Sequence, residues 1–450
     1  MGLVGMLLLT VGYFSATHVA RSVSPLHAAA KGAAPSVEVL SARRTPANLS
    51  NITRIGALTR AMASFSSRVP SQSCSQVDWL GHTVLNVNSN LAVTPASSTK
   101  VITASVALAV LGPQFTYETR VKTTTTPTGA VVDNLYFIGG GDPLLSRNEY
   151  IATEKYPTIH PSSLEALADK IVASGIRQVT GSIVVDDSRY DTVRFVDVWP
   201  QEFHYTESGP LGALSVDDGV VLGQNVKPDD PALAAATELR SLLATRGVLV
   251  ANDAQRGVVP ATSHDIATLT SAPLTDVISE MLTNSDNNTA ELLLKEIGFA
   301  AKKTGSTVAG LQTVQEYLTK WQLGGQIIMN DGSGLSANNK IPCSAFMSLL
   351  QREEKTLPGL MAVAGVSGTI RDASDPSPVQ GRLVGKTGTL NGVKALVGYL
   401  PLDGEEPVVY SLLLHQVGID NMSAYRPIWN ALGDALNKAR ATPRPDQLVP

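Results

Sequence analysis

Apolar runs with helical or strand-like spacing cover most of the chain. Residues 101–111 contain only two polar side chains and are followed by Gly-Pro, which predicts a buried helix that ends there. Helical periodicity returns over residues 274–306, and residues 423–441 predict a closing helix. Residues 381–400 and 407–418 are strand-like and flank an Asp-Gly turn. These two parts of the chain therefore predict an antiparallel sheet flanked by helices.

The middle of the chain has a different, mixed pattern. Residues 117–138 contain two strand-like runs around a Pro-Thr-Gly turn, and residues 162–176 have the spacing of an amphipathic helix. Short strands are predicted within 181–190 and 212–226, and residues 231–250 predict a helix followed by a strand. The fold class that follows is α+β, with a separate, mixed and partly β-rich region between the two parts of the antiparallel domain.

The first twenty residues contain no Asp, Glu, Lys or Arg. A helix of this length can cross about 30 Å of hydrocarbon, but a signal peptide or a buried N-terminal helix also fits the pattern. We expect export, with residues 1–22 acting either as a cleaved signal or as an anchor through which residues 2–20 contact a membrane. Residues 23–45 are rich in Ala, Ser and Pro and predict a flexible linker.

Composition and charge exclude several functions. The chain has 450 residues, 43% of them apolar, which is enough to bury more than one core. The net charge is −4 and no long basic run occurs, so a nucleic-acid partner is not expected. The Cys and His spacings of zinc sites are missing, and no metal site is predicted. The two cysteines, Cys74 and Cys343, could form a disulfide in an oxidising compartment or stay unrelated buried thiols.

The segment PASSTK, at residues 95–100, places a serine and a lysine three residues apart at the start of the buried helix. Ser97 and Lys100 therefore lie on one face. A serine hydroxyl needs an adjacent base to act as a nucleophile, and a lysine can be that base only when burial or a second cation lowers its pKa. Ser98 lacks this spacing, so Ser97 is the candidate nucleophile. The alternative is a helix-capping serine beside a surface lysine.

Three Ser-x-Asn patterns occur, which shows how unspecific this motif is. They begin at Ser146, Ser285 and Ser336. The copy at 285–287 directly precedes a long apolar helix, so Ser285 and Asn287 are the candidates for chemistry, although the same residues could only cap that helix. Asp286, between them, is expected to point elsewhere.

The triplet Lys-Thr-Gly occurs twice, at 303–305 and at 386–388. The first copy follows a Leu- and Ala-rich helix, where a lysine suits the last turn and a glycine the residue after it. We interpret it as structural. The second copy lies on a predicted strand, whose edge can present a lysine, hydroxyls and a backbone N–H to an extended peptide. We interpret this copy, Lys386, Thr387 and Gly388, as functional.

Taken in order, Ser-x-x-Lys, Ser-x-Asn and Lys-Thr-Gly form the trio of class A β-lactamases and penicillin-binding proteins. The segments GGGDPLL, SDNNTAELLLKEIG, DGSGLS and GKTGTLNGVKALVGYL extend the likeness over residues 70 to 420. The chain resembles the D-alanyl-D-alanine carboxypeptidase/endopeptidases of the class C, type-4, low-molecular-mass penicillin-binding proteins. Ser97 and Ser285 are 188 positions apart, a long gap that matches the insertion of that family.

The resemblance implies a fold and a domain arrangement. It implies a serine β-lactamase/penicillin-binding-protein-like catalytic domain, formed by residues 46–122 and 266–440, with residues 123–265 inserted and 441–450 as a tail. It also implies that Cys74 and Cys343, which match cysteine positions of actinobacterial members, form a disulfide. The protein is then expected in the cell envelope, outside the cytoplasm.

For the chemistry, the resemblance implies that Ser97 attacks the carbonyl between two D-alanines of a peptidoglycan peptide while Lys100 takes its proton. Ser285 relays a proton to the leaving amine, and Asn287 helps to hold the relay. The substrate carboxylate binds to the strand that carries Lys386, Thr387, Gly388 and Thr389. The backbone N–H groups of Ser97 and Thr389 form the oxyanion hole. No cofactor is needed, and β-lactams are expected to acylate the same serine.

Two other functions remain open at this point: a serine β-lactamase or esterase on the same scaffold, and a catalytically silent wall-binding protein. No glutamate is placed like the deacylating base of class A β-lactamases, since Glu316 is expected on a solvated helix face. This favours a peptidase. Asp142, in GGGDPLL, is expected to form a turn.

Overall fold

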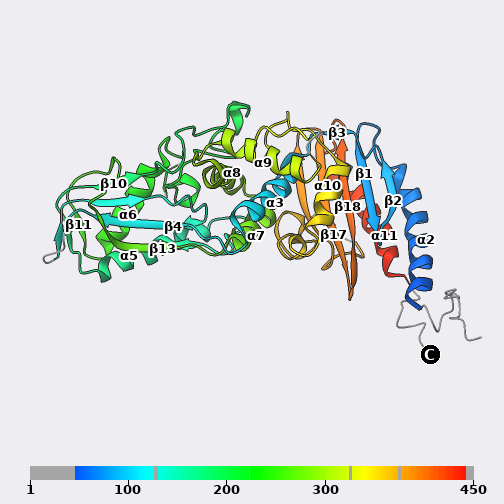
Figure 1. Cartoon of the computed structure of the whole chain (residues 1–450), viewed down its shortest axis with the longest axis horizontal. Coiled ribbons are helices and arrows are strands. Elements are labelled where there is room, and N and C mark those ends of the chain that lie inside the picture. Colours follow the sequence, from blue (N-terminus) through cyan, green and yellow to red (C-terminus); the bar gives the residue numbers. More distant parts are fainter. Residues whose placement is uncertain are drawn as a thin grey trace, which may run out of the picture.

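The computed structural model describes residues 46–441, apart from 126–129, 222, 225, 324–326 and 373–376. The expected leader and linker, residues 1–45, lie outside the described residues, as does the predicted Pro-Thr-Gly turn. The described chain is elongated, with two bodies built around separate sheets (Figure 1). We call residues 46–117 and 271–441 the main body and residues 118–270 the inserted body. Among the described helices, none is long and apolar enough to cross a membrane.

The main body contains a six-stranded, fully antiparallel sheet that joins the two ends of the chain. Its strands, in spatial order, are β15 (Ala362–Val363), β16 (Val384–Leu390), β17 (Val393–Leu402), β18 (Glu405–His415), β1 (Cys74–Trp79) and β2 (His82–Val87). The turn between β17 and β18 contains the predicted Asp-Gly pair. The predicted antiparallel sheet is therefore confirmed.

Both faces of this sheet are covered, which explains why its central strands are apolar at nearly every position. On β17, Ala395 and Val397 pack into the core beneath one set of helices, and Leu396 and Leu400 into the core on the opposite face. The first set comprises α3 (Lys100–Leu111), α7 (Leu274–Asn284), α8 (Asn287–Lys302), α9 (Thr307–Lys320) and α10 (Cys343–Arg352). The opposite face is covered by α2 (Pro46–Ser66) and α11 (Met422–Leu436).

Short elements complete the main body. They are β3 (Ala92–Val93), β14 (Ile341–Pro342) and the 3-10 turns η1 (Ala96–Thr99), η4 (Leu357–Gly359), η5 (Gly368–Ile370) and η6 (Asn437–Arg440). The disulfide implied by the resemblance is present: the sulfur atoms of Cys74 and Cys343 are 2.09 Å apart. It ties the first residue of β1 to the first residue of α10.

The inserted body contains a mixed five-stranded sheet, in the order β12 (Gln255–Arg256), β10 (Ile183–Asp186), β6 (Leu135–Ile138), β4 (Glu118–Thr123) and β13 (His264–Thr270). Helices α5 (Leu164–Ala173) and α6 (Pro231–Thr245) contribute to its separate core. Smaller elements complete it: β5 (Val131–Val132), β7 (Leu145–Ser146), α4 (Asn148–Ile151), β8 (Ser162–Ser163), β9 (Gln178–Val179), β11 (Leu249–Val250), η2 (Gln201–Phe203) and η3 (Asp217–Gly219).

The five-stranded sheet begins five residues before and ends five residues after the range 123–265. The division into catalytic and inserted domains stays a prediction.

One strand prediction in the inserted body is wrong. The described residues of 212–226 form no strand, although several are buried. The backbone turns at Asp217 and Asp218, both at a φ of 54°. Asp217 is fully buried and accepts hydrogen bonds from the backbone and the guanidinium of Arg147. The buried run is therefore shaped by a buried ion pair, which an apolar pattern does not reveal.

Candidate active site

Ser97 lies in η1, just before α3, and is half-buried. The preceding residue, Ala96, has a φ of 50°, in the left-handed region that a non-glycine residue rarely adopts. Gly334 packs against this turn so closely that a Cβ there would lie 2.0 Å from the Ala96 carbonyl oxygen. Backbone strain of this kind is often found at functional sites, and here it fixes the position of the candidate nucleophile.

Lys100 lies one helical turn after Ser97, and its side chain is fully buried. Its Nζ is 3.1 Å from Ser97 Oγ, 2.6 Å from Asn287 Oδ1 and 2.7 Å from the Ser333 carbonyl oxygen. Burial lowers the pKa of Lys100 to about 8, and nearby carboxylates limit the shift. The capping alternative is therefore wrong, because the lysine is not on the surface and the serine caps no helix.

Ser285 and Asn287 lie at the junction of α7 and α8, where Ser285 has a φ of 66°. Ser285 Oγ accepts a hydrogen bond of 2.8 Å from Lys386 Nζ. Asn287 accepts from Lys100 and donates to the Glu207 carbonyl oxygen at 2.8 Å. Asp286 caps α8 by accepting from the backbone N–H of Thr289 at 3.0 Å, and burial raises the pKa of its carboxyl.

The second Lys-Thr-Gly triplet lies on β16, as predicted. Lys386 is fully buried, and its pKa lies well below the usual value because of burial and of two other lysines, Lys100 and Lys394. Gly388 contacts the η1 turn: a Cβ there would lie 2.6 Å from the Pro95 carbonyl oxygen. The glycine thus lets the strand lie against the segment that carries Ser97.

The outer edge of β16 is open beyond its first residues. In the described structure β15 pairs only with Val384 and Gly385, so no strand covers the triplet. Thr387 shares a hydrogen bond of 2.6 Å with the Thr369 hydroxyl. Thr389, which is exposed, accepts a hydrogen bond of 2.8 Å from Lys394 Nζ. An extended peptide can therefore add to this edge.

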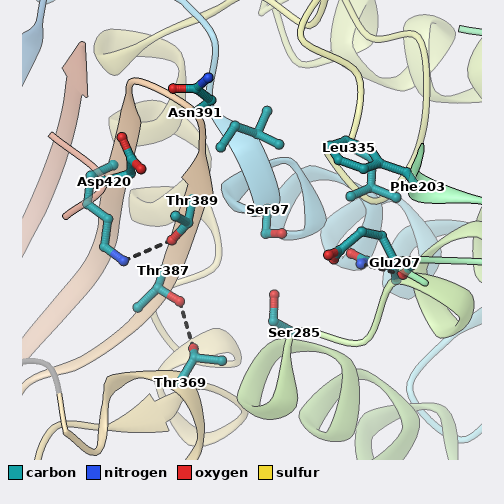
Figure 2. A pocket seen from close by; sticks show the side chains of 13 residues that line it. Ser97, Phe203, Glu207, Ser285, Leu335, Thr369, Thr387, Thr389, Asn391 and Asp420 are labelled. Atoms are coloured by element: carbon teal, nitrogen blue, oxygen red, sulfur yellow. Dashed lines mark hydrogen bonds between the residues drawn. The ribbon is translucent and has the colours of Figure 1, made fainter. Parts of the chain in front are cut away.

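These residues surround one cleft of about 570 Å³ (Figure 2). The predicted residues that line it are Ser97, Ser285, Asn287, Thr387 and Thr389. Ser97 and Ser285 point toward one another in Figure 2, with Thr387 and Thr389 on one side and Phe203 and Leu335 on the other. Hydrogen bonds place the amine of Lys100 next to the Ser97 hydroxyl and the amine of Lys386 next to the Ser285 hydroxyl.

Sequence reasoning missed eight further lining residues: Phe203, Glu207, Leu335, Thr369, Leu390, Asn391, Lys394 and Asp420. Phe203 and Glu207 come from the inserted body, and nothing local in the sequence places them at the cleft. Lys394 could have been found, because Asn391-Gly392 is a strong hairpin signal that places residue 394 opposite Thr389.

The other motif copies lie away from the cleft. Lys303 is exposed and ends α8, as a structural triplet should. The role given to its glycine is wrong, however, because Lys303 itself has the left-handed φ of 58°. Gly305 instead forms a β-bridge with Tyr190 of the inserted body. A Cβ on Gly305 would lie 2.4 Å from the carbonyl oxygen of Arg189.

The Ser146 and Ser336 copies of Ser-x-Asn are not among the residues that line the cleft. Glu316 is exposed and pairs with Lys302 at 2.7 Å, as expected of a solvated helix face. Asp142 is buried, stabilises its own turn through the Leu144 N–H, and does not line the cleft. Within the described residues, no group of three or more His, Cys, Asp or Glu is placed to hold a metal ion.

A serine beside a buried lysine, a second serine–lysine pair and an open strand edge together define a class of protein. This is the class of serine enzymes that form acyl intermediates on the β-lactamase and penicillin-binding-protein scaffold. The model of the D-Ala-D-Ala carboxypeptidase 3 (S13) family matches residues 80–230 and 221–432. The chain belongs to this family, and it is a serine-type D-Ala-D-Ala carboxypeptidase that acts on peptidoglycan.

Individual relatives agree with this assignment. The chain is 29% identical over 393 residues to the D-alanyl-D-alanine carboxypeptidase of Actinomadura sp. (strain R39), covering 68% of this chain and 70% of that one. It is 27% identical over 344 residues to carboxypeptidase DacB of Mycolicibacterium smegmatis, covering 72% of each. Penicillin binding protein 4 of Haemophilus influenzae has the same fold, with a TM-score of 0.67 at 21% identity over 82% of this chain and 99% of that one.

Proposed function

We propose that this carboxypeptidase works through an acyl-enzyme on Ser97 with Lys100 as its base. The observation that carries the proposal is the 3.1 Å separation of Lys100 Nζ and Ser97 Oγ inside a buried network. Ser97 Oγ attacks the carbonyl carbon between the two D-alanines, and its proton passes to Lys100 Nζ. The C–N bond then breaks, an ester to Ser97 remains, and water hydrolyses that ester.

Lys100 can accept a proton only as a neutral amine. With a pKa of about 8, about a tenth of the molecules carry the neutral form at pH 7. A lysine with its ordinary pKa would be neutral in far fewer molecules at this pH. The buried position at the start of α3 therefore supplies the base that a serine nucleophile needs.

The leaving amine needs a proton, and Ser285 is positioned to supply it. Its hydroxyl accepts from Lys386 and points toward Ser97 across the cleft (Figure 2). Asn287 holds Lys100 by accepting a hydrogen bond from its Nζ. We assign proton relay to Ser285 and positioning of Lys100 to Asn287.

The substrate's C-terminal carboxylate is assigned to the open edge of β16. Lys386 contributes the amine that donates to Ser285, and Thr387 and Thr389 contribute hydroxyl groups. Gly388 allows the strand to lie close to η1. The backbone N–H groups of Ser97 and Thr389 are assigned to the oxyanion hole, where one such donor typically contributes about 100- to 1000-fold in rate.

The partners and location follow from the reaction. We assign peptidoglycan peptides ending in D-Ala-D-Ala as substrates, and β-lactams as compounds that acylate Ser97. The family acts outside the cytoplasm, where peptidoglycan lies. Residues 1–22 are proposed, from sequence alone, to take the chain there as a signal peptide or an anchor. Cleavage of cross-linked peptides is a further proposed activity, since a predatory peptidoglycan endopeptidase of Bdellovibrio bacteriovorus has this fold with a TM-score of 0.54 at 18% identity.

The test is mass spectrometry of the protein after exposure to benzylpenicillin, combined with an assay for released D-alanine. Ser97→Ala should abolish both the covalent adduct and D-alanine release. Ser98→Ala is the matched control, because the Ser98 hydroxyl is buried and does not line the cleft. Stoichiometric acylation of Ser97→Ala would assign the nucleophile elsewhere. Rapid turnover of a cephalosporin without D-alanine release by the wild type would indicate a β-lactamase.

A further inference from the structure

A third lysine, Lys394, lines the cleft. It lies on β17 directly opposite Thr389 in the strand register, and its Nζ donates a hydrogen bond of 2.8 Å to Thr389 Oγ1. The residue is only 8% exposed, and it opens onto the same cleft as Ser97. None of the assigned steps uses this lysine.

The surroundings of Lys394 leave its charge without an ion-pair partner. Its Nζ lies 4.0 Å from the ring centroid of Tyr425 and 5.2 Å from that of Trp429, both on α11. Within the described residues it makes no ion pair. Asp420 is the acidic residue that faces it, and one oxygen of this carboxylate accepts from the backbone N–H of Gly392. Lys386 is another titratable group in this region, and the charge of Lys394 helps to lower its pKa.

An almost fully buried cation without an ion-pair partner is costly unless an anion reaches it. The aromatic rings compensate in part, because the electron-rich face of an aromatic ring attracts a cation. The remaining open side of Lys394 is the cleft, and the anionic group of the assigned substrate is its C-terminal carboxylate. The substrate carboxylate can therefore supply the ion-pair partner that Lys394 lacks.

We propose that Lys394 is a specificity-determining residue that, together with Thr389, selects ligands carrying a free carboxylate next to the bond that is broken. The inference rests on the proposed function. Because Thr389 Oγ1 accepts from Lys394, the hydrogen of the Thr389 hydroxyl is free to donate to the carboxylate. The hydroxyl of Thr387, by contrast, already shares a hydrogen bond with Thr369. Lys394 thus orients the Thr389 hydroxyl as a donor and adds positive charge next to it.

The experiment compares acylation by benzylpenicillin, which carries the carboxylate, with acylation by its methyl ester, which does not. Lys394→Met should lower the second-order acylation rate constant for the acid about tenfold and that for the ester less than about twofold. Lys320→Met is the matched control, since Lys320 also lies over an aromatic ring, Tyr317, but is exposed and does not line the cleft. It should leave both constants unchanged.

A measurement on the wild type keeps the test valid if Lys394→Met folds poorly. Burial lowers the pKa of Lys394 to about 8, so its charge is lost as the pH rises through this value. The acid-to-ester ratio of rate constants should therefore fall between pH 7 and pH 9, while effects of Lys100 cancel because both ligands need it. Lys394→Arg, which stays charged, should abolish this fall.

Equal losses for acid and ester in Lys394→Met, or a ratio that does not change with pH in the wild type, would overturn the inference and leave Lys394 a structural residue. Failure of the proposed function would look different, because then neither ligand would acylate Ser97 in any variant. A ratio that falls with pH in Lys394→Met as steeply as in the wild type would assign the effect to Lys386 and also reject the inference.

Discussion

At the scale of single residues, two lysines that each begin a Lys-Thr-Gly triplet differ in burial and in hydrogen bonding. Lys303 is exposed at the end of α8, whereas Lys386 is fully buried and donates to Ser285 Oγ at 2.8 Å. We expect Lys386→Ala to lower kcat/KM for D-alanine release by at least about 100-fold, because it removes the amine that donates a hydrogen bond to Ser285. Lys303→Ala should stay within about twofold of the wild type.

The measurement is steady-state release of D-alanine from a peptide ending in D-Ala-D-Ala, with circular dichroism to confirm folding. Lys303→Ala is the matched control because it changes the same triplet in the other position. Similar losses in both variants would contradict the distinction drawn between the two triplets.

The predictability of the site also differs from residue to residue. Ser97 and Lys100 could be identified because their spacing acts within a single helical turn. The choice of Lys386 required only a strand pattern around it. Glu207 and Thr369 could not be predicted, because their places at the cleft depend on how distant segments fold back. Lys394 lies between these cases, since only the register of one hairpin connects it with Thr389.

At the scale of elements, α8 shows what periodicity can and cannot predict. The helical pattern over 274–306 is confirmed, but it is divided into two helices, α7 and α8. The break lies at Ser285, which has a left-handed φ of 66°. This interruption brings Ser285 and Asn287 to the cleft. An apolar pattern specifies which helix face is buried, but it does not show that the backbone bends at a serine. The strand predicted within 212–226 failed for a related reason, since a buried ion pair shapes that segment.

The disulfide between β1 and α10 allows a prediction at this scale. It closes a loop with a sequence separation of 269 residues, so its removal should increase the entropy of the unfolded chain. Replacing Cys74 and Cys343 together by alanine should lower the free energy of unfolding by about 2–4 kcal/mol. Neither cysteine lines the cleft, so the acylation rate constant should stay within about twofold of the wild type.

Urea unfolding of the oxidised wild type and of the double variant checks this prediction. The reduced wild type is the control, because it keeps both sulfur atoms but lacks the bond. Equal stability of the oxidised and reduced wild type would show that the bridge contributes nothing measurable. A large loss of acylation in the double variant would show that the bridge also supports the cleft.

At the scale of the whole molecule, the inserted body contacts the main body close to the candidate active site. Arg189 pairs with Glu296 of α8 at 2.6 Å, and Trp199 Nε1 donates to the carboxylate of Asp331 at 2.9 Å. Asp331 is fully buried and also accepts from the backbone N–H groups of Gly334 and Ser336. The loop organised in this way presents the Ser333 carbonyl oxygen to Lys100. The inserted body therefore helps to hold Lys100, the proposed base, through this loop.

This connection can be tested by Trp199→Phe, which keeps an aromatic ring but removes the N–H donor. The Asp331 carboxylate then loses one of its buried hydrogen bonds, a change that typically costs about 1–3 kcal/mol. We expect a lower melting temperature and, because the loop that positions Lys100 loosens, acylation by benzylpenicillin slower by about tenfold. Trp321→Phe, on the main body away from the cleft, controls for the loss of an indole. If Trp199→Phe lost stability but acylated at the wild-type rate, the inserted body would support the fold without contributing to the position of Lys100.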